Sequence, residues 1–336
     1  MINIRNEVPL LPFNTFGIPA IAALLVESGD AAELAGYVRS LPDPSAAFVL
    51  GGGSNILMTS ERYQVMIRPE IKGIELTDET DETVCVRAGA GEVWDDFVSW
   101  CVEHQYAGVE NLSHIPGTVG ACPIQNIGAY GAEAKDVIEN VEAIEKATGK
   151  HVTFSNRQCS FGYRSSFFKK NKEKYIITSV QFRLSKRFKP KLKYAGLGQE
   201  LSRDMPVTLE NVRQTVIRIR SGKLPDPREL GNAGSFFKNP TINTEKSEEI
   251  TRFDLEAPLY NISPGRWKIS AAWLIQQCGW KGVREGRVGT HVQQPLVIVN
   301  YGGATGKEIL GFANRIMDSV NHRFGIELEV EVNIVE

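Results

Sequence analysis

The sequence predicts a protein of mixed α and β structure, and three observations indicate this. Helix-like and strand-like stretches alternate along its 336 residues. The segment 326–335 alternates apolar and polar residues, which is the period of a half-buried strand. The apolar content of 42% and the charged content of 23% are ordinary for a soluble globular chain, and such a length allows about two domains.

The first helix is expected in 29–40, where Asp30 and Glu33 form a capping box ahead of an apolar face. A strand, a glycine-rich turn and a second apolar run follow in 46–58. Residues 83–104 then predict a strand, a glycine turn and another helix. The expected apolar face of that helix consists of Val93, Phe97, Trp100 and Cys101.

The middle of the chain continues with β structure and one long helix. Residues 141–155 predict a hairpin that turns at ATGK, and 175–185 predict another strand. A helix is expected to begin at Thr208 and to end before the prolines of 208–227. We place a domain boundary at this proline-rich exit, with a second unit in 228–303.

The last third of the chain is expected to hold two more helices. The first lies around 269–279 and is followed by a strand in 295–300. Thr305 and Glu308 cap the second helix, and Gly325 ends it. The apolar stripe of that helix is Ile309, Ala313, Ile316, Val320 and Phe324. The apolar face of the strand expected after it is Ile326, Leu328, Val330, Val332 and Ile334.

Charge and composition argue against several kinds of partner. The formal net charge of -2 disfavours a dedicated nucleic-acid binder, which usually has a basic excess. The N-terminal residues lack the features of a signal peptide, and the apolar run 20–26 is too short to cross a bilayer. We therefore expect a cytoplasmic protein with no nucleic-acid or membrane partner. The cysteines lack metal-ligand spacing and are expected to be reduced core residues, namely Cys85, Cys101, Cys122, Cys159 and Cys278.

The common hydrolase and nucleotide-binding motifs are absent, which disfavours a hydrolase. The sequence contains no GxSxG, no HExxH and no P-loop motif. Ser235 lies in GNAGSFFKNP (231–240), where it could be a nucleophile, a helix cap or an acid. The GGGSN turn (51–55) forms either an anion cradle of backbone N–H groups or a plain flexible turn.

Further stretches have both a binding and a structural interpretation. Residues 114–133 contain four glycines and almost no charge, so they form either a buried loop against a planar cofactor or an ordinary connection. Arg164 lies among aromatic residues in 159–169, where it either meets a carboxylate or phosphate or stacks on tyrosine at the surface. The basic stretches 168–175 and 187–194 are solvated loops or an anion-attracting rim. In the tail, periodicity does not distinguish Glu331 from Glu327 or Glu329.

A set of stretches in a fixed order carries a family resemblance. The stretches are NTFGI (14–18), LGGGSNIL (50–57), ENLSHIPGTVGACPIQNIGAYG (110–131), FGYR (161–164), SGKLPDP (221–227), GNAGSFFKNP (231–240) and LEVEV (328–332). Together they resemble the UDP-N-acetylenolpyruvoylglucosamine reductases, the flavoenzymes that make UDP-N-acetylmuramate for bacterial peptidoglycan. The chain departs from the usual family motifs at Cys122, Val330 and Asn333 and in the SGK before Leu224.

The resemblance implies an α+β fold. An FAD-binding domain of the vanillyl-alcohol-oxidase (PCMH) type is expected in two subdomains, with a separate α+β substrate-binding domain. The implied subdomains are 1–70, joined by the C-terminal strand 326–336, and 71–220. The implied substrate-binding domain is 221–325.

The resemblance also implies the site residues. Ser235 matches the serine that protonates the substrate, with Lys238 or a water supporting it, and Arg164 and Glu331 match the other two catalytic residues. The matching substrate contacts are Tyr194, Lys223, Asn239, Tyr260 and Gln294. The expected FAD contacts are Gly51, Gly52, Gly53, Ser54, Asn55, Pro116, Gly117, Gly120, Ala121, Cys122, Gln125, Asn126, Gly128, Tyr130 and Gly131.

The implied activity is reduction of an enolpyruvyl ether of a UDP-sugar, with FAD as cofactor and NADPH as electron donor. The chain is expected to act as a monomer on this small-molecule substrate. The alternatives are a related FAD-dependent oxidase of a sugar or lactone and a catalytically inactive flavin- or nucleotide-binding protein.

Overall fold

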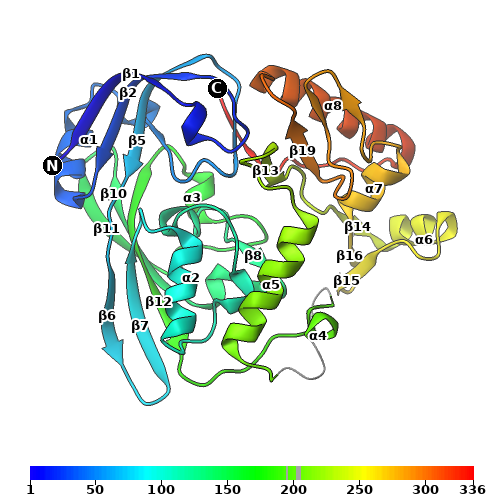
Figure 1. Cartoon of the computed structure of the whole chain (residues 1–336), viewed down its shortest axis with the longest axis horizontal. Coiled ribbons are helices and arrows are strands. Elements are labelled where there is room, and N and C mark those ends of the chain that lie inside the picture. The colour runs from blue at the N-terminus through cyan, green and yellow to red at the C-terminus, as the bar shows by residue number, and fades with distance from the viewer. Residues whose placement is uncertain (194–195, 202–205) are drawn as a thin grey trace. The chain divides into compact units, whose positions relative to one another are not determined.

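The structure, a computed structural model, describes residues 1–193, 196–201 and 206–336. Its contacts divide the chain into two compact units, whose elements are labelled in Figure 1. The first unit consists of Met1–Val8, Ile21–Gly53 and Arg62–Ser221. The second unit consists of Pro9–Ala20, Ser54–Glu61 and Gly222–Glu336. The implied division into two FAD-binding subdomains and a substrate-binding domain stays a prediction.

The first unit contains a four-stranded sheet in the order β1-β2-β5-β3. Its strands are β1 (Asn3–Pro9), β2 (Ile21–Ser28), β5 (Arg62–Pro69) and β3 (Phe48–Val49). Both β2 and β3 pair with β5 in parallel. Helix α1 (Ala31–Ser40) buries Leu34 and Val38 in the core beside this sheet. The predicted capping box is only half formed: the Asp30 carboxylate accepts the amide N–H of Glu33 at 2.8 Å, but the amide N–H of Asp30 donates to the Ser28 hydroxyl.

The first unit also contains a five-stranded antiparallel sheet in the order β11-β10-β12-β7-β6. Its strands are β11 (Lys150–Ser155), β10 (Ile138–Glu145), β12 (Tyr175–Ser185), β7 (Thr83–Gly89) and β6 (Ile74–Glu79). The predicted hairpin and the two predicted strands of this region are confirmed. Helix α2 (Trp94–Glu103) packs on the sheet with Phe97 and Cys101 fully buried. The prediction was wrong for Val93, which is 43% exposed, because it is the N-cap and precedes the helical turn that sets the apolar face.

Helix α5 (Leu209–Lys223) begins where the sequence predicts, since the Thr208 hydroxyl accepts the amide N–H of Asn211 at 3.1 Å. An ion pair joins it to α2, with Arg213 Nη1 2.7 Å from Asp95 Oδ1. The shorter elements of the first unit are β8 (Gly128–Ala129), β9 (Ala132–Glu133), α3 (Phe167–Lys170) and α4 (Leu197–Glu200).

The second unit has a four-stranded sheet in the order β13-β19-β18-β17. Its strands are β13 (Gly231–Ser235), β19 (Val297–Asn300), β18 (Val288–Thr290) and β17 (Arg284–Glu285). The predicted helices of this region are confirmed as α7 (Ala271–Gln277) and α8 (Gly306–Phe324). Thr305 and Glu308 form the capping box of α8, Gly325 ends it with φ 61°, and its predicted apolar stripe is buried.

Sequence reasoning missed a small antiparallel sheet in the order β14-β16-β15. Its strands are β14 (Thr241–Asn243), β16 (Arg266–Ile269) and β15 (Leu259–Ser263). Helix α6 (Thr244–Phe253) follows β14, and the Asn243 side chain caps it by accepting the amide N–H of Lys246. The sequence did not predict this sheet because its strands are short and do not clearly alternate apolar and polar residues.

The C-terminal tail also departs from the prediction. Only Asn333–Val335 forms a strand, β20, which pairs in parallel with β4 (Ile56–Met58). Upstream of β20, an isolated bridge joins Val330 to Phe237. A regular strand over 326–335 was therefore wrong, because the tail changes partner along its length and no single ladder continues. Its buried apolar side chains are Ile326, Leu328, Val332 and Val335.

Candidate functional site

Two glycine loops of the first unit approach each other at the level of the main chain. A Cβ added to Gly52 would lie 2.8 Å from the Cα of Gly117. A Cβ on Gly51 would lie 3.1 Å from the Thr118 hydroxyl oxygen, and one on Gly120 would lie 2.7 Å from the Cβ of Ala90. The approach of the two loops therefore requires glycine at 52, and Gly120 is needed separately for its contact with Ala90.

The same loops have the properties of an anion cradle. Gly53 and Gly117 have φ angles of 64° and 127°, a backbone conformation that glycine adopts without strain. Within the described residues, no hydrogen bond from the amide N–H of Gly51 or Gly52 is found. Such N–H groups suit the diphosphate of a dinucleotide, so the residues present fit FAD.

The catalytic arginine of the prediction is held by the same loop. Arg164 occupies a tight turn closed by two hydrogen bonds, from Gly162 N–H to the Ser165 carbonyl at 2.9 Å and from Ser165 N–H to the Gly162 carbonyl at 3.2 Å. Its φ is 50°, in the left-handed region. Arg164 Nη2 donates to the carbonyl of Gly128 at 2.8 Å. The structure therefore brings together Arg164 and Gly128, two residues predicted for different roles.

Sequence reasoning missed a second guanidinium close to Arg164. Burial lowers the pKa of Arg220 below its ordinary value, and the charge of nearby Arg164 lowers it further, while Tyr130 and Asp95 oppose this. Arg220 Nε donates to the carbonyl of His114 at 3.1 Å. The RIR pattern of 218–220 could not reveal this, since only the fold shows which arginine turns inward.

The predicted FAD contacts of the 116–131 loop differ in accessibility. Cys122 and Asn126 have exposed fractions of 1% and 0%, so a direct contact with a cofactor requires neighbouring atoms to move. Burial raises the pKa of the Cys122 thiol well above its ordinary value, which keeps it protonated and unreactive. The other predicted residues of this loop are exposed or half-buried, namely Pro116, Gly117, Gly120, Ala121, Gln125, Gly128, Tyr130 and Gly131.

In the second unit, the predicted proton donor lies next to the tail. Ser235 is the last residue of β13 and is half-buried. The amide N–H of Glu331 donates to the carbonyl of Phe236 at 2.8 Å, which places the main chain of Glu331 beside the neighbour of Ser235. The ammonium of Lys238 pairs with Glu329, and its role beside Ser235 stays a prediction. Glu331 and Glu329, which periodicity could not separate, thus differ in their surroundings.

The departure at Asn333 has a structural role in this unit. Its amide N–H and its Nδ2 both donate to the carbonyl of Asn55, each at 3.0 Å. Asn55 and its half-buried neighbour Ser54 are predicted FAD contacts. Asn333 therefore holds the second half of the GGGSN turn in place.

The predicted substrate residues lie on several elements. Asn239 Oδ1 accepts the amide N–H of Ala271, the first residue of α7, at 2.9 Å. Tyr260 on β15 is 62% exposed and Lys223 at the end of α5 is exposed. Gln294 is half-buried before β19. Tyr194, also predicted, lies outside the described residues.

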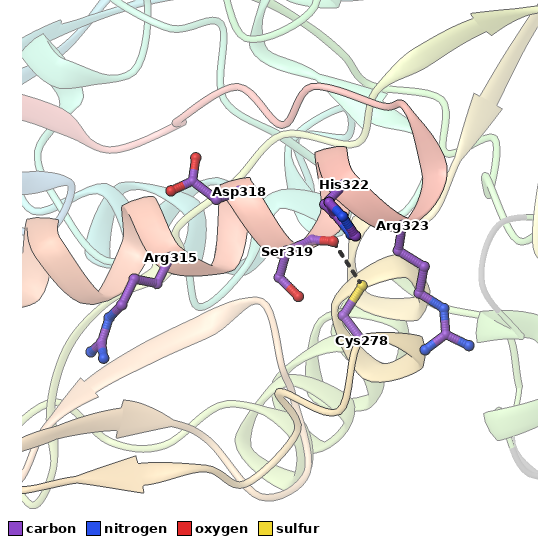
Figure 2. Close-up of a pocket in the computed structure, with 6 residues that line it drawn as sticks. All are labelled: Cys278, Arg315, Asp318, Ser319, His322 and Arg323. Carbon is purple, nitrogen blue, oxygen red and sulfur yellow. Dashed lines mark hydrogen bonds between the residues drawn. The ribbon is translucent and has the colours of Figure 1, made fainter.

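A surface depression of the second unit contains none of the predicted site residues. Figure 2 shows the side chains that line it, Cys278, Arg315, Asp318, Ser319, His322 and Arg323. The Cys278 thiol donates to the Ser319 carbonyl at 3.6 Å, and burial raises its pKa. Arg323 donates to the carbonyl of Gln277 and Arg315 pairs with Glu285. These groups join α8 to neighbouring elements and do not form a second site.

The described part of the chain shows neither a metal site nor a membrane-spanning helix. Within it, no group of histidine, cysteine and acidic side chains is arranged to hold a metal ion. No helix there has the length and apolar character needed to cross a bilayer. All five cysteines are free thiols, as predicted.

Comparison with the sequences of known proteins supports an FAD-binding domain and the family that the motifs resemble. The profile of a family described as an FAD binding domain matches residues 22–155, and one described as the C-terminal domain of UDP-N-acetylenolpyruvoylglucosamine reductase matches 226–335. The UDP-N-acetylenolpyruvoylglucosamine reductase of Bacteroides fragilis is 45% identical over 98% of this chain and 100% of its own length. The enzyme of the same name from Pseudomonas aeruginosa is 42% identical over 99% of both chains.

A solved structure supports the fold. The crystal structure of UDP-N-acetylenolpyruvylglucosamine reductase from Thermus caldophilus aligns over 100% of both chains with a TM-score of 0.71 and 24% identity. The α+β fold with an FAD-binding domain of the vanillyl-alcohol-oxidase type and a separate C-terminal domain is thereby confirmed.

Proposed function

The chain belongs to the UDP-N-acetylenolpyruvoylglucosamine reductase family, and from this premise we propose that it reduces UDP-N-acetylenolpyruvoylglucosamine to UDP-N-acetylmuramate for peptidoglycan synthesis. The observation that carries the proposal is the contact of the tail with the residue that follows Ser235, through the hydrogen bond from Glu331 N–H to the Phe236 carbonyl. It gathers two of the three predicted catalytic residues within one unit.

The cofactor is FAD and the electron donor is NADPH. When bound, FAD supplies hydride-transfer chemistry. The amide N–H groups of Gly51 and Gly52 bind its diphosphate, and the cationic neighbourhood of Arg164 and Arg220 compensates negative charge nearby.

Arg164 stabilises the negative charge that develops on the substrate. Its planar guanidinium can meet the enolpyruvyl carboxylate at two points, while its bond to the Gly128 carbonyl fixes the orientation. A fixed cation acts on the charge without reorganisation, and removing such a group typically lowers the rate about 10²–10³-fold. Arg164→Lys preserves the positive charge but removes the planar guanidinium that can meet the carboxylate at two points.

Ser235 donates the proton that completes the reduction. Its hydroxyl protonates the carbon next to the carboxylate, so Ser235 acts as an acid and needs no partner histidine. Glu331 joins this proton network. Tyr194, Lys223, Asn239, Tyr260 and Gln294 bind the sugar nucleotide in this proposal, and a cytoplasmic monomer remains the expected state.

The test replaces Ser235 with alanine and follows the two half-reactions without oxygen. NADPH should still bleach the flavin of Ser235→Ala, whereas reoxidation by the enolpyruvyl sugar nucleotide should slow by about 10²–10⁴-fold. Ser319→Ala, a half-buried serine on α8, is the matched control and should keep both rates. Rapid reoxidation by the sugar nucleotide in Ser235→Ala would refute the role of Ser235, and reoxidation of the wild type by dioxygen alone would favour the oxidase alternative.

A further inference from the structure

The Asn126 side chain holds two segments of the first unit together. Its Nδ2 donates to the carbonyl of Gly162 at 3.1 Å and to Glu133 Oε2 at 3.0 Å. Its Oδ1 accepts the amide N–H of Lys135 at 2.9 Å. Both amide hydrogens are therefore used inside the protein, and the residue is fully buried.

The carbonyl that Asn126 binds belongs to the turn of Arg164. The Gly162 carbonyl also accepts the amide N–H of Ser165, the hydrogen bond that closes this turn. Arg164 is the third residue of the turn and has a left-handed φ of 50°. A non-glycine residue in this conformation is strained and keeps it only when its surroundings hold it.

Further contacts fix the turn against the same loop. Arg164 Nη2 donates to the Gly128 carbonyl at 2.8 Å, and the Ser166 hydroxyl donates to the Ile124 carbonyl. Asn126 lies between these two acceptors in the chain. It has a left-handed φ of 47° itself, which asparagine tolerates better than most residues.

We propose that Asn126 is a positioning residue that sets the orientation of Arg164 towards the substrate carboxylate. This inference rests on the proposed function and goes beyond its prediction as an FAD contact, since a fully buried side chain with both donors used acts through the residues it binds. Asn126 matters for the step in which Arg164 faces developing charge and not for reduction of the flavin by NADPH.

The main variant is Asn126→Asp, which keeps the size and the acceptor for Lys135 but removes both donors. It also places a carboxylate where the amide lay 3.0 Å from Glu133, and the Gly162 carbonyl loses the Asn126 donor and keeps the amide N–H of Ser165. A misplacement of about 1 Å can cost about 10²-fold in rate. With FAD bound, we expect reoxidation by the enolpyruvyl sugar nucleotide to slow about tenfold to a hundredfold, while reduction by NADPH stays within about twofold.

The matched control is Asn156→Asp in the same unit. Asn156 Nδ2 donates to the carbonyls of Lys135 and Ile138 at 2.9 and 2.7 Å, so the control removes the same kind of bond away from the Arg164 turn. It should leave both half-reactions unchanged. Asn126→Gly, which tolerates a left-handed φ, is the second variant if Asn126→Asp does not fold.

A double-mutant cycle with Arg164→Lys decides whether the effect passes through Arg164. If it does, adding Asn126→Asp to Arg164→Lys should slow reoxidation by less than about threefold more. Any of three results would overturn the inference. They are multiplicative effects of the two substitutions, equal slowing of both half-reactions, and loss of FAD from both Asn126 variants while Asn156→Asp retains it. If the wild type itself fails to reduce the enolpyruvyl sugar nucleotide, the proposed function fails instead.

Discussion

Lys146 is a buried cation whose titration should be visible in stability. Its side chain is 2% exposed, and Nζ donates to the carbonyl of Ala47 at 2.6 Å within the first unit. Burial lowers the pKa of Lys146 from 10.5 to about 8, while the charges of Glu173 and Asp43 oppose this. Charging the buried amine therefore costs free energy in the folded state.

The sign and size of the effect follow from the two pKa values. Below pH 8 the amine is protonated in both the folded and the unfolded states, so the free-energy cost of burying its charge does not change with pH. Between about 8 and 10.5 the unfolded state binds more protons, so the free energy of unfolding rises with pH. At about 1.36 kcal/mol per pH unit, the rise is about 3 kcal/mol across this window.

The assay is urea unfolding of wild type and Lys146→Met at several pH values from 7 to about 10.5, followed by tryptophan fluorescence. The difference between the two free energies should change by about 3 kcal/mol in favour of the wild type as pH rises. Lys150→Met, an exposed lysine on the neighbouring strand β11, is the control and should give a flat difference. A flat difference for Lys146→Met as well would refute the reasoning.

Two further changes test particular contacts. Gly52→Ala should lower the FAD content of the purified protein, as measured by flavin absorbance, because its Cβ would lie 2.8 Å from the Gly117 Cα; full flavin loading would contradict the cradle. Asp95→Asn should cost about 3 kcal/mol of unfolding free energy, since it leaves buried Arg213 without its counter-charge. Asp226→Asn, which breaks an exposed ion pair, should cost less than about 1 kcal/mol, and an equal loss in both variants would contradict the assignment.

The local elements were predictable from the sequence because their causes are local. The capping box of Thr305 and Glu308, the stripe along α8 and the glycine with left-handed φ at 325 need only neighbours within a few residues. The hairpin of β10 and β11 likewise follows from two adjacent strands and one turn. The family motifs identified the candidate residues for the same reason, since each motif is a short continuous stretch.

Contacts between residues that are far apart in the sequence could be identified only from the fold. Asn126 donates to the carbonyl of Gly162, which lies 36 residues further along the chain. The carbonyl of His114 accepts from Arg220, which lies 106 residues further along. Hydrophobic periodicity identifies which face of an element is buried but not which element covers it. For this reason the tail was predicted as one strand, although it changes partner at 330–333.

The sequence by itself determined the class of fold and most helix ends, and it supplied the candidate residues for the chemistry. Only the tertiary structure decided that Arg164 donates to the Gly128 carbonyl, that the half-buried Arg220 donates to the His114 carbonyl, and that Glu329 pairs with Lys238. The physical reason is that a side chain's charge and orientation depend on atoms within a few ångströms, and folding alone sets which atoms those are.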